Sequence, residues 1–181
     1  RHAGTHLLAR IDQLVARSES EKGMLELEIE PGEIETELQS CLSRVRPLTE
    51  ARGIHLEADA IENAEVEADR DRLQQVLEIL LVNAIKHSRE GSVVRIGSTS
   101  IDQARQRIEI QGTGDDIADE ALALLMKPSP AMASGSTDSE GEADAIGLVL
   151  AKRLIEAMNS QLHSETVPGG GTLFRIEMPL A

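Results

Sequence analysis

The stretch Leu73-Gln-Gln-Val-Leu-Glu-Ile-Leu-Leu-Val-Asn-Ala-Ile-Lys-His-Ser88 carries a clear helical period. Its apolar residues recur every three or four positions, which places them on one face of a helix. Asp69, shortly before it, is favoured as an N-cap because a carboxylate accepts hydrogen bonds from free backbone N–H groups. Gly91 ends the unit. The predicted buried face consists of Leu73, Val76, Leu77, Leu80, Leu81 and Ala84.

The segments on either side of this helix alternate between strand and helix patterns. Before it we expect a strand over 25–30, a break at Pro31-Gly32, a helix over 33–51, and strands near 54–58 and 65–68. After it we expect strands over 93–99 and 107–110, helices over 118–126 and 146–158, and strands near 161–167 and 172–179. Residues 127–144 lack periodicity and are rich in Ser, Gly, Pro, Asp and Glu, which predicts a mobile loop. This order predicts an α/β fold, a two-layer α+β sandwich whose sheet has helices on a single face.

The composition excludes several classes of function. The 181 residues include 18 Lys and Arg against 32 Asp and Glu, so the formal net charge is −14. Nucleic acids and anionic membranes attract basic surfaces, so we expect no nucleic-acid partner and no membrane contact through this segment. Phe174 is the only aromatic residue, which leaves no platform for stacking bases or sugars. Cys41, the only cysteine, follows the apolar spacing of the 33–51 helix, so we expect a buried thiol.

The N-terminal segment predicts a helix that continues from another part of a longer protein. Leu7, Ile11 and Leu14 repeat with a spacing of four and then three, which suits either a helix–helix seam or an ordinary amphipathic helix. The chain begins at Arg1 rather than Met, and no signal peptide or membrane-spanning run is visible. We therefore expect a cytoplasmic fragment, with the cytoplasmic part of a membrane sensor as one option.

Three motifs in order resemble the ATP-binding region of sensor histidine kinases. The segment Leu77-Glu-Ile-Leu-Leu-Val-Asn-Ala-Ile-Lys-His-Ser88 resembles the N box of that family and of the wider gyrase–chaperone–kinase ATPase superfamily. Ile146-Gly-Leu148 and the residues after it resemble the helix that follows the ATP lid. Gly169-Gly-Gly-Thr-Leu-Phe-Arg-Ile-Glu-Met-Pro179 resembles the terminal glycine–threonine hairpin. Each motif alone is weak evidence, but their order and spacing are together fairly specific.

The resemblance implies a Bergerat-type ATPase fold with a mixed sheet. It implies that residues 1–22 end the dimerisation helix, that residues 23–181 form the ATPase domain, and that 127–144 are its ATP lid. ATP and Mg²⁺ are the implied ligands, and Asn83 matches the family's magnesium ligand, a hard oxygen donor. The implied partners are a response regulator and the dimerisation domain of the same kinase, as a homodimer in the full protein. The implied nucleotide-binding residues are Asn83, Lys86, His87, Gly114, Gly147, Leu148 and Thr172.

The same resemblance predicts the reaction, which is transfer of the ATP γ-phosphoryl group to a histidine and then to an Asp of a response regulator. A phosphoacceptor histidine in this family is usually followed by an acidic residue. None of the five histidines in this chain has an acidic residue after it. We therefore expect the phosphoacceptor upstream of Arg1 and no catalytic residue in this segment.

The motifs depart from the family pattern at positions that would hold the nucleotide. Gly112 stands where the family has the Asp that accepts a hydrogen bond from adenine, and Ile79 stands where a polar residue lies one turn before Asn83. Glu78 is adjacent, but one residue turns about 100° around a helix, so it faces elsewhere. Losing a charged acceptor costs about 1.5–3 kcal/mol, so we expect weak or absent ATP binding. Three further family glycines are replaced by Asp116, Ala143 and Ala145.

Other classes of function stay open on this sequence, and catalytic competence is uncertain. A pseudokinase would keep the fold for docking and allostery without using ATP. A module for another nucleotide, such as a cyclic dinucleotide, would need a remodelled pocket, and nothing in the sequence selects that ligand. A chaperone- or gyrase-type ATPase is disfavoured because Ile79 stands near the position of the glutamate that would activate water.

Overall fold

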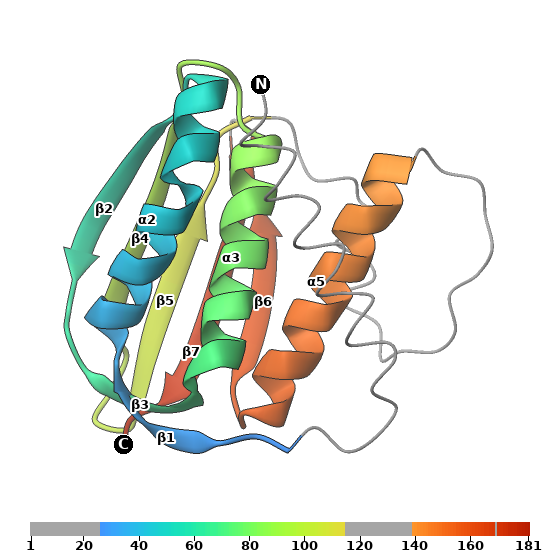
Figure 1. The fold of residues 1–181 in the computed structure, drawn as a ribbon. Coiled ribbons are helices and arrows are strands. Elements are labelled where there is room, and N and C mark those ends of the chain that lie inside the picture. The colour runs from blue at the N-terminus through green and yellow to red at the C-terminus, as the bar shows by residue number, and fades with distance from the viewer. Residues whose placement is uncertain (1–25, 115–138, 169) are drawn as a thin grey trace.

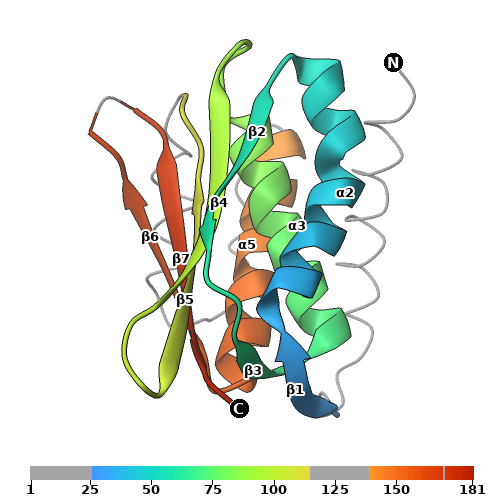
Figure 2. The same cartoon turned by 90° about the vertical axis from the view of Figure 1, so that its left-hand side faces the viewer.

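Helices and a sheet form two layers in this protein. The structure is a computed structural model that describes residues 26–114, 139–168 and 170–181. Figures 1 and 2 show the helices of this described part packed on one face of a five-stranded sheet. The expected helices near 6–18 and 118–126, and most of the expected loop over 127–144, lie outside the described residues.

The sheet is mixed, as predicted. Its strand order is β2-β4-β5-β7-β6, where β2 runs parallel to β4 and the other neighbours are antiparallel. A second, two-stranded sheet pairs β1 with β3. The prediction of a mixed sheet with helices on one face is therefore confirmed. The described elements are β1 Ile29–Glu33, α2 Ile34–Arg52, β2 His55–Ile61, β3 Glu65–Asp69, α3 Arg70–Lys86, β4 Val93–Ser100, β5 Arg105–Gln111, α5 Ser139–Ala157, β6 Gln161–Thr166 and β7 Thr172–Pro179.

The expected chain break at Pro31-Gly32 is wrong. Both residues lie inside β1, which pairs antiparallel with β3 from Ile29 opposite Asp69 to Glu33 opposite Glu65. Within the described part of the chain β3 is the only strand that pairs with β1. Proline is tolerated on such an edge because its missing N–H can face away from the partner strand. The strand also begins later than the expected start at residue 25.

The central helix α3 begins as predicted and is buried more completely than its sequence period indicates. The Asp69 carboxylate accepts a hydrogen bond from the Arg72 backbone N–H at 3.0 Å, which confirms the N-cap. Every residue from Leu73 to Ile85 is buried. Figure 1 shows the reason, because α2 and α5 flank α3 on both sides while the sheet lies behind it. Polar residues of α3 therefore also lie inside the protein.

Helix α5 begins earlier than expected. It starts at Ser139, so residues 139–144 belong to a helix and not to the predicted mobile loop. The segment from 139 to 145 contains two Ala and two Glu, which form helices readily. The segment has no large apolar residue, so it lacks the periodic signal on which the prediction relied.

The core is almost entirely aliphatic. Phe174 is fully buried, and so is Cys41, as predicted. The Cys41 thiol donates to the Gln74 carbonyl oxygen at 3.6 Å. Burial raises the pKa of this thiol to about 12, so it stays protonated at neutral pH. Among the described residues, none of the helices combines the length and the apolar composition that a membrane span requires.

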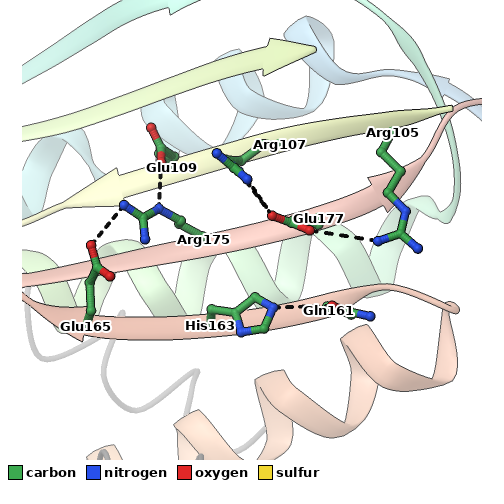
Figure 3. Close-up of polar contacts among 8 residues, drawn as sticks. All are labelled: Arg105, Arg107, Glu109, Gln161, His163, Glu165, Arg175 and Glu177. Carbon is green, nitrogen blue, oxygen red and sulfur yellow. Dashed lines mark hydrogen bonds and ion pairs between the residues drawn. The ribbon is translucent and has the colours of Figure 1, made fainter. Parts of the chain in front are cut away.

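The other face of the sheet carries paired charges, which Figure 3 shows on β5, β7 and β6. Arg107 lies opposite Glu177 on the neighbouring strand, and its Nη2 is 2.7 Å from Oε1 of Glu177. Arg175 Nε lies 2.8 Å from Glu109 Oε1, and Arg175 Nη2 lies 2.8 Å from Glu165 Oε1. Because neighbouring side chains point to opposite faces of a strand, these pairs alternate with the buried Phe174 and its apolar neighbours.

Candidate functional site

The predicted nucleotide-binding residues gather where α3 ends. His87 is the C-cap of α3, and the next residue, Ser88, bridges to Gly114 just beyond β5. The Gly112 N–H donates to the carbonyl oxygen of Thr172 at 3.0 Å, which joins the end of β5 to the start of β7. The candidate site is therefore built from the end of α3, the segment after β5, the start of β7 and the first half of α5.

Asn83 has a buried oxygen atom without a hydrogen-bond partner. The residue is 4% exposed, and its Nδ2 donates to the Ile79 carbonyl oxygen one turn earlier at 2.9 Å. Its Oδ1 has no partner among the described residues. A buried acceptor without a partner costs about 1–3 kcal/mol. Within the described residues this oxygen is thus left as an acceptor for a cation or a ligand donor, which fits the magnesium role implied by the sequence.

Lys86 and His87 hold a carboxylate from α5. Lys86 Nζ lies 2.6 Å from Oδ1 of Asp144, and His87 Nε2 lies 3.1 Å from Oδ2. The Lys86 and Asp144 side chains are only 10% and 13% exposed. Burial by itself raises the pKa of Asp144, but hydrogen bonds from His87 and Lys86 and their charges outweigh it, so the pKa lies below its ordinary value. The carboxylate is therefore ionised at neutral pH.

Two glycines allow backbone segments to approach closely beside this cluster. A Cβ on Gly114 would lie 2.0 Å from the His87 carbonyl oxygen. Gly171 has φ +109°, and a Cβ there would lie 2.2 Å from the Gly112 carbonyl oxygen. Only residues without a side chain fit such approaches. In this structure, backbone of the same chain lies against these glycines.

Two positions that depart from the family pattern have different surroundings. Ile79 is 2% exposed, and its Cγ2 lies 3.5 Å from the position that a Cβ on Gly147 would occupy. The missing amide is thus replaced by an apolar contact between α3 and α5. Gly112 has a negative or extended φ, but a Cβ there would lie 3.0 Å from the Ala84 carbonyl oxygen. A side chain at Gly112 would need a small shift of its neighbours.

Glu78 faces away from the site, as its place on the helix predicted. Its carboxylate lies 3.8 Å from Arg44 Nη1 on α2.

The predicted site residues near the start of α5 differ in burial. Leu148 is fully buried, with 0% exposed surface, and Ala145 is half-buried. Asp116 and the side chain of Ala143 lie outside the described residues.

Sequence reasoning missed Asp144 and Ser88 as members of this cluster. Ser88 Oγ donates to the Ala84 carbonyl oxygen at 2.7 Å and accepts from the Thr113 N–H at 3.2 Å. Asp144 lies between the two replaced lid glycines, at a position that the family pattern leaves free. Its charge was the only available signal, and residues 127–144 contain three other acidic residues.

Comparisons with known proteins support the resemblance that the motifs indicated. Residues 68–181 match the family described as histidine kinase-, DNA gyrase B- and HSP90-like ATPase. The chain is 33% identical over 181 residues to the non-motile and phage-resistance protein of Caulobacter vibrioides, which covers 98% of this chain and 21% of that protein. It is 30% identical over 179 residues to the sensor histidine kinase GacS of Pseudomonas protegens, over 96% of this chain and 19% of that protein.

A solved structure shows the same fold. Histidine kinase ThkA, in complex with response regulator protein TrrA, superposes with a TM-score of 0.74 and 21% identity over 98% of this chain and 49% of that chain. This chain spans about a fifth of the length of the two curated relatives. The family match covers more than half of the chain and includes α3, α5 and the terminal hairpin. The chain therefore belongs to the histidine kinase-, DNA gyrase B- and HSP90-like ATPase family.

Proposed function

We propose that this chain is the ATP-binding catalytic domain of a two-component sensor histidine kinase. In this proposal it positions ATP for transfer of the γ-phosphoryl group to a histidine outside residues 1–181, and a response-regulator Asp then receives the group. The family match and the relative named a sensor histidine kinase support the proposal. The structure of ThkA in complex with a response regulator supports the choice of partner. The dimerisation-helix role of 1–22 and the lid role of 127–144 remain parts of the same proposal.

The unpaired Oδ1 of Asn83 is the observation that carries this proposal. It is a hard oxygen ligand, buried at the position the family uses for magnesium. The Thr172 hydroxyl, in a residue 3% exposed, also has no hydrogen-bond partner among the described residues. Asn83 would hold the metal, and Lys86 and His87 would hold phosphate oxygens. When bound, Mg²⁺ would neutralise phosphate charge, while the protein would contribute mainly positioning and electrostatics.

The proposal includes weak ATP binding. Gly112 offers no carboxylate to the adenine amine, and Ile79 places a methyl group against α5 in place of a polar ligand. Each missing charged or polar contact lowers affinity by about ten- to a hundred-fold. We therefore expect a dissociation constant for Mg-ATP far above the micromolar range.

A pseudokinase is the second candidate, and one specific observation favours it. The two side chains that would meet phosphate, Lys86 and His87, are already bonded to Asp144. A domain whose phosphate-binding side chains are occupied by its own carboxylate would serve as a docking or allosteric module on the same fold. The two candidates differ in whether Mg-ATP binds at all.

Calorimetric titration with Mg-ATP tests the proposal. The parent should bind weakly and saturably, and Asn83→Ala should lose the magnesium-dependent part of that affinity. Asn63→Ala is the matched control, because Asn63 is an exposed amide between β2 and β3. Low-micromolar binding by the parent would contradict weak affinity. Absence of binding at millimolar ATP would favour the pseudokinase, and equal loss in both variants would remove the role of Asn83.

A further inference from the structure

Asp144 pairs with two basic side chains, of which Lys86 has little contact with water. Lys86 Nζ and His87 Nε2 contact different oxygens of the same carboxylate, at 2.6 and 3.1 Å. The His87 side chain is 31% exposed, and Lys86 and Asp144 are far less exposed. A charge buried to this extent needs a partner, and here α5 supplies it to α3.

A phosphate group in the position of this carboxylate would meet the same donors, Lys86 and His87. Carboxylate and phosphate oxygens accept the same kinds of hydrogen bond from a lysine ammonium group and from a histidine ring N–H. The unpaired Oδ1 of Asn83 lies on the same helix, one turn before Lys86. The end of α3 itself presents backbone carbonyl groups and not N–H groups. Lys86 and His87, which now contact the Asp144 carboxylate, are therefore the donors that α3 offers to an anion.

We propose that Asp144 is an intramolecular competitor for phosphate, and that this residue sets the affinity of the site for phosphoanhydrides such as pyrophosphate and nucleoside triphosphates. The carboxylate must leave Lys86 and His87 before a phosphate group binds them. The proposal rests on the proposed function only in taking a nucleotide as the natural ligand. It assigns a role to a residue that the motif pattern leaves free.

The packing of α5 explains why this competition is strong. Gly147, one turn after Asp144, lies against Ile79 of α3, and the neighbouring Leu148 is fully buried. The packed helix therefore holds the carboxylate beside Lys86, so their ion pair forms without the loss of translational entropy that a free anion would undergo on binding. A tethered ligand of this kind acts at an effective concentration on the order of millimolar or higher. A free phosphate group binds Lys86 and His87 only if its affinity and concentration outweigh this effective concentration of the carboxylate.

The test is titration of the folded chain and its variants with inorganic pyrophosphate and, separately, with ATP. Asp144→Asn keeps the shape of the side chain and removes its charge. It should bind pyrophosphate about ten- to a hundred-fold more tightly than the parent, the effect of a charged hydrogen-bonding competitor. Glu156→Gln is the matched control, because it removes one negative charge from the same helix, where Glu156 pairs with Lys152 at 3.8 Å. It should change the affinity by less than about twofold.

Further arms separate the possible outcomes. Adding Lys86→Met to Asp144→Asn should abolish the gain. If Asp144→Asn gains for pyrophosphate while no variant binds ATP, the competitor role stands and the nucleotide proposal fails. If the parent binds ATP and Asp144→Asn binds neither ligand more tightly, the competitor role is overturned and the nucleotide proposal stands. If no variant binds either ligand, the role is also overturned.

A measurement on the parent keeps the proposal testable if Asp144→Asn does not fold. Saturating pyrophosphate should shift the carboxyl ¹³C resonance of Asp144, because the carboxylate loses its contacts with Lys86 and His87. The Glu156 resonance serves as the internal control and should not move. An unchanged Asp144 resonance when pyrophosphate is bound would overturn the proposal.

Discussion

Single glycines decide how closely the chain segments approach at the candidate site. Gly114→Ala would bring a Cβ within 2.0 Å of the His87 carbonyl oxygen, so the segment after β5 would have to move. We expect a loss of about 2–3 kcal/mol in the free energy of unfolding, measured by urea denaturation. Gly32→Ala is the control, since no atom lies within 4 Å of its Cβ position. Equal effects of both changes would contradict this prediction.

Gly112 is the position at which a lost nucleotide contact can be restored. Gly112→Asp returns the carboxylate that would accept from the adenine amine, and we expect Mg-ATP affinity to rise by about tenfold. The φ angle is compatible with Asp, but Ala84 and Ser88 must give by a few tenths of an ångström. Gly112→Ala adds the same Cβ without a carboxylate. Calorimetry should show the gain for Asp alone, and a similar gain for Ala would assign it to packing.

At the scale of elements, the Asp144 carboxylate adds a pH-dependent contribution to the contact between α3 and α5. The folded-state pKa of Asp144 is lowered, so its pairing stabilises the protein above the unfolded pKa of about 3.9. This contribution is lost as the pH falls through the folded-state pKa. We expect Asp144→Asn to lower the melting temperature at pH 7, and the difference from the parent to shrink below about pH 4. A difference that stays constant down to pH 2 would show that the ion pair does not contribute.

The same helix pair explains why the second lost polar position cannot simply be restored. Ile79 is 2% exposed and packs on Gly147, so Ile79→Asn would bury an amide in an apolar contact. We expect a loss of about 1–3 kcal/mol in stability, measured by urea denaturation. Ile79→Leu, which keeps the volume, should cost less than about 1.5 kcal/mol. A parent-like stability of Ile79→Asn would indicate a polar pocket between α3 and α5.

At the scale of the whole molecule, the two faces of the sheet contribute differently to stability. On β7, Phe174 is fully buried under the helices, whereas Glu177 is paired with Arg107 on the open face in Figure 3. Phe174→Ala should lower stability by about 3–5 kcal/mol. Glu177→Gln should cost less than about 1 kcal/mol and lose its effect in high salt. Denaturation followed by circular dichroism measures both, and comparable losses would contradict this division.

The sequence by itself determined the order of the described elements, but not the bounds of β1 and α5. The helical period before Ser88, the N-cap at Asp69 and the strand near 172–179 depend on neighbouring residues, and all three appear in the structure as expected. The order of the N box and the terminal hairpin also sufficed to predict the family and the mixed sheet. Such features are local or ordered along the chain, so consecutive residues encode them.

Only the tertiary structure decided what the candidate site contains. Lys86 and Asp144 are separated by 58 positions, and their ion pair depends on how α5 lies against α3. The contact of Ile79 with Gly147 and the place of Pro31 in an edge strand arise in the same way. The physical reason is that these interactions depend on distances between segments far apart in the sequence, which local periodicity and turn propensity do not specify. The resemblance to the N box therefore indicated Lys86 and His87 as donors, and only packing showed that the chain's own carboxylate binds them.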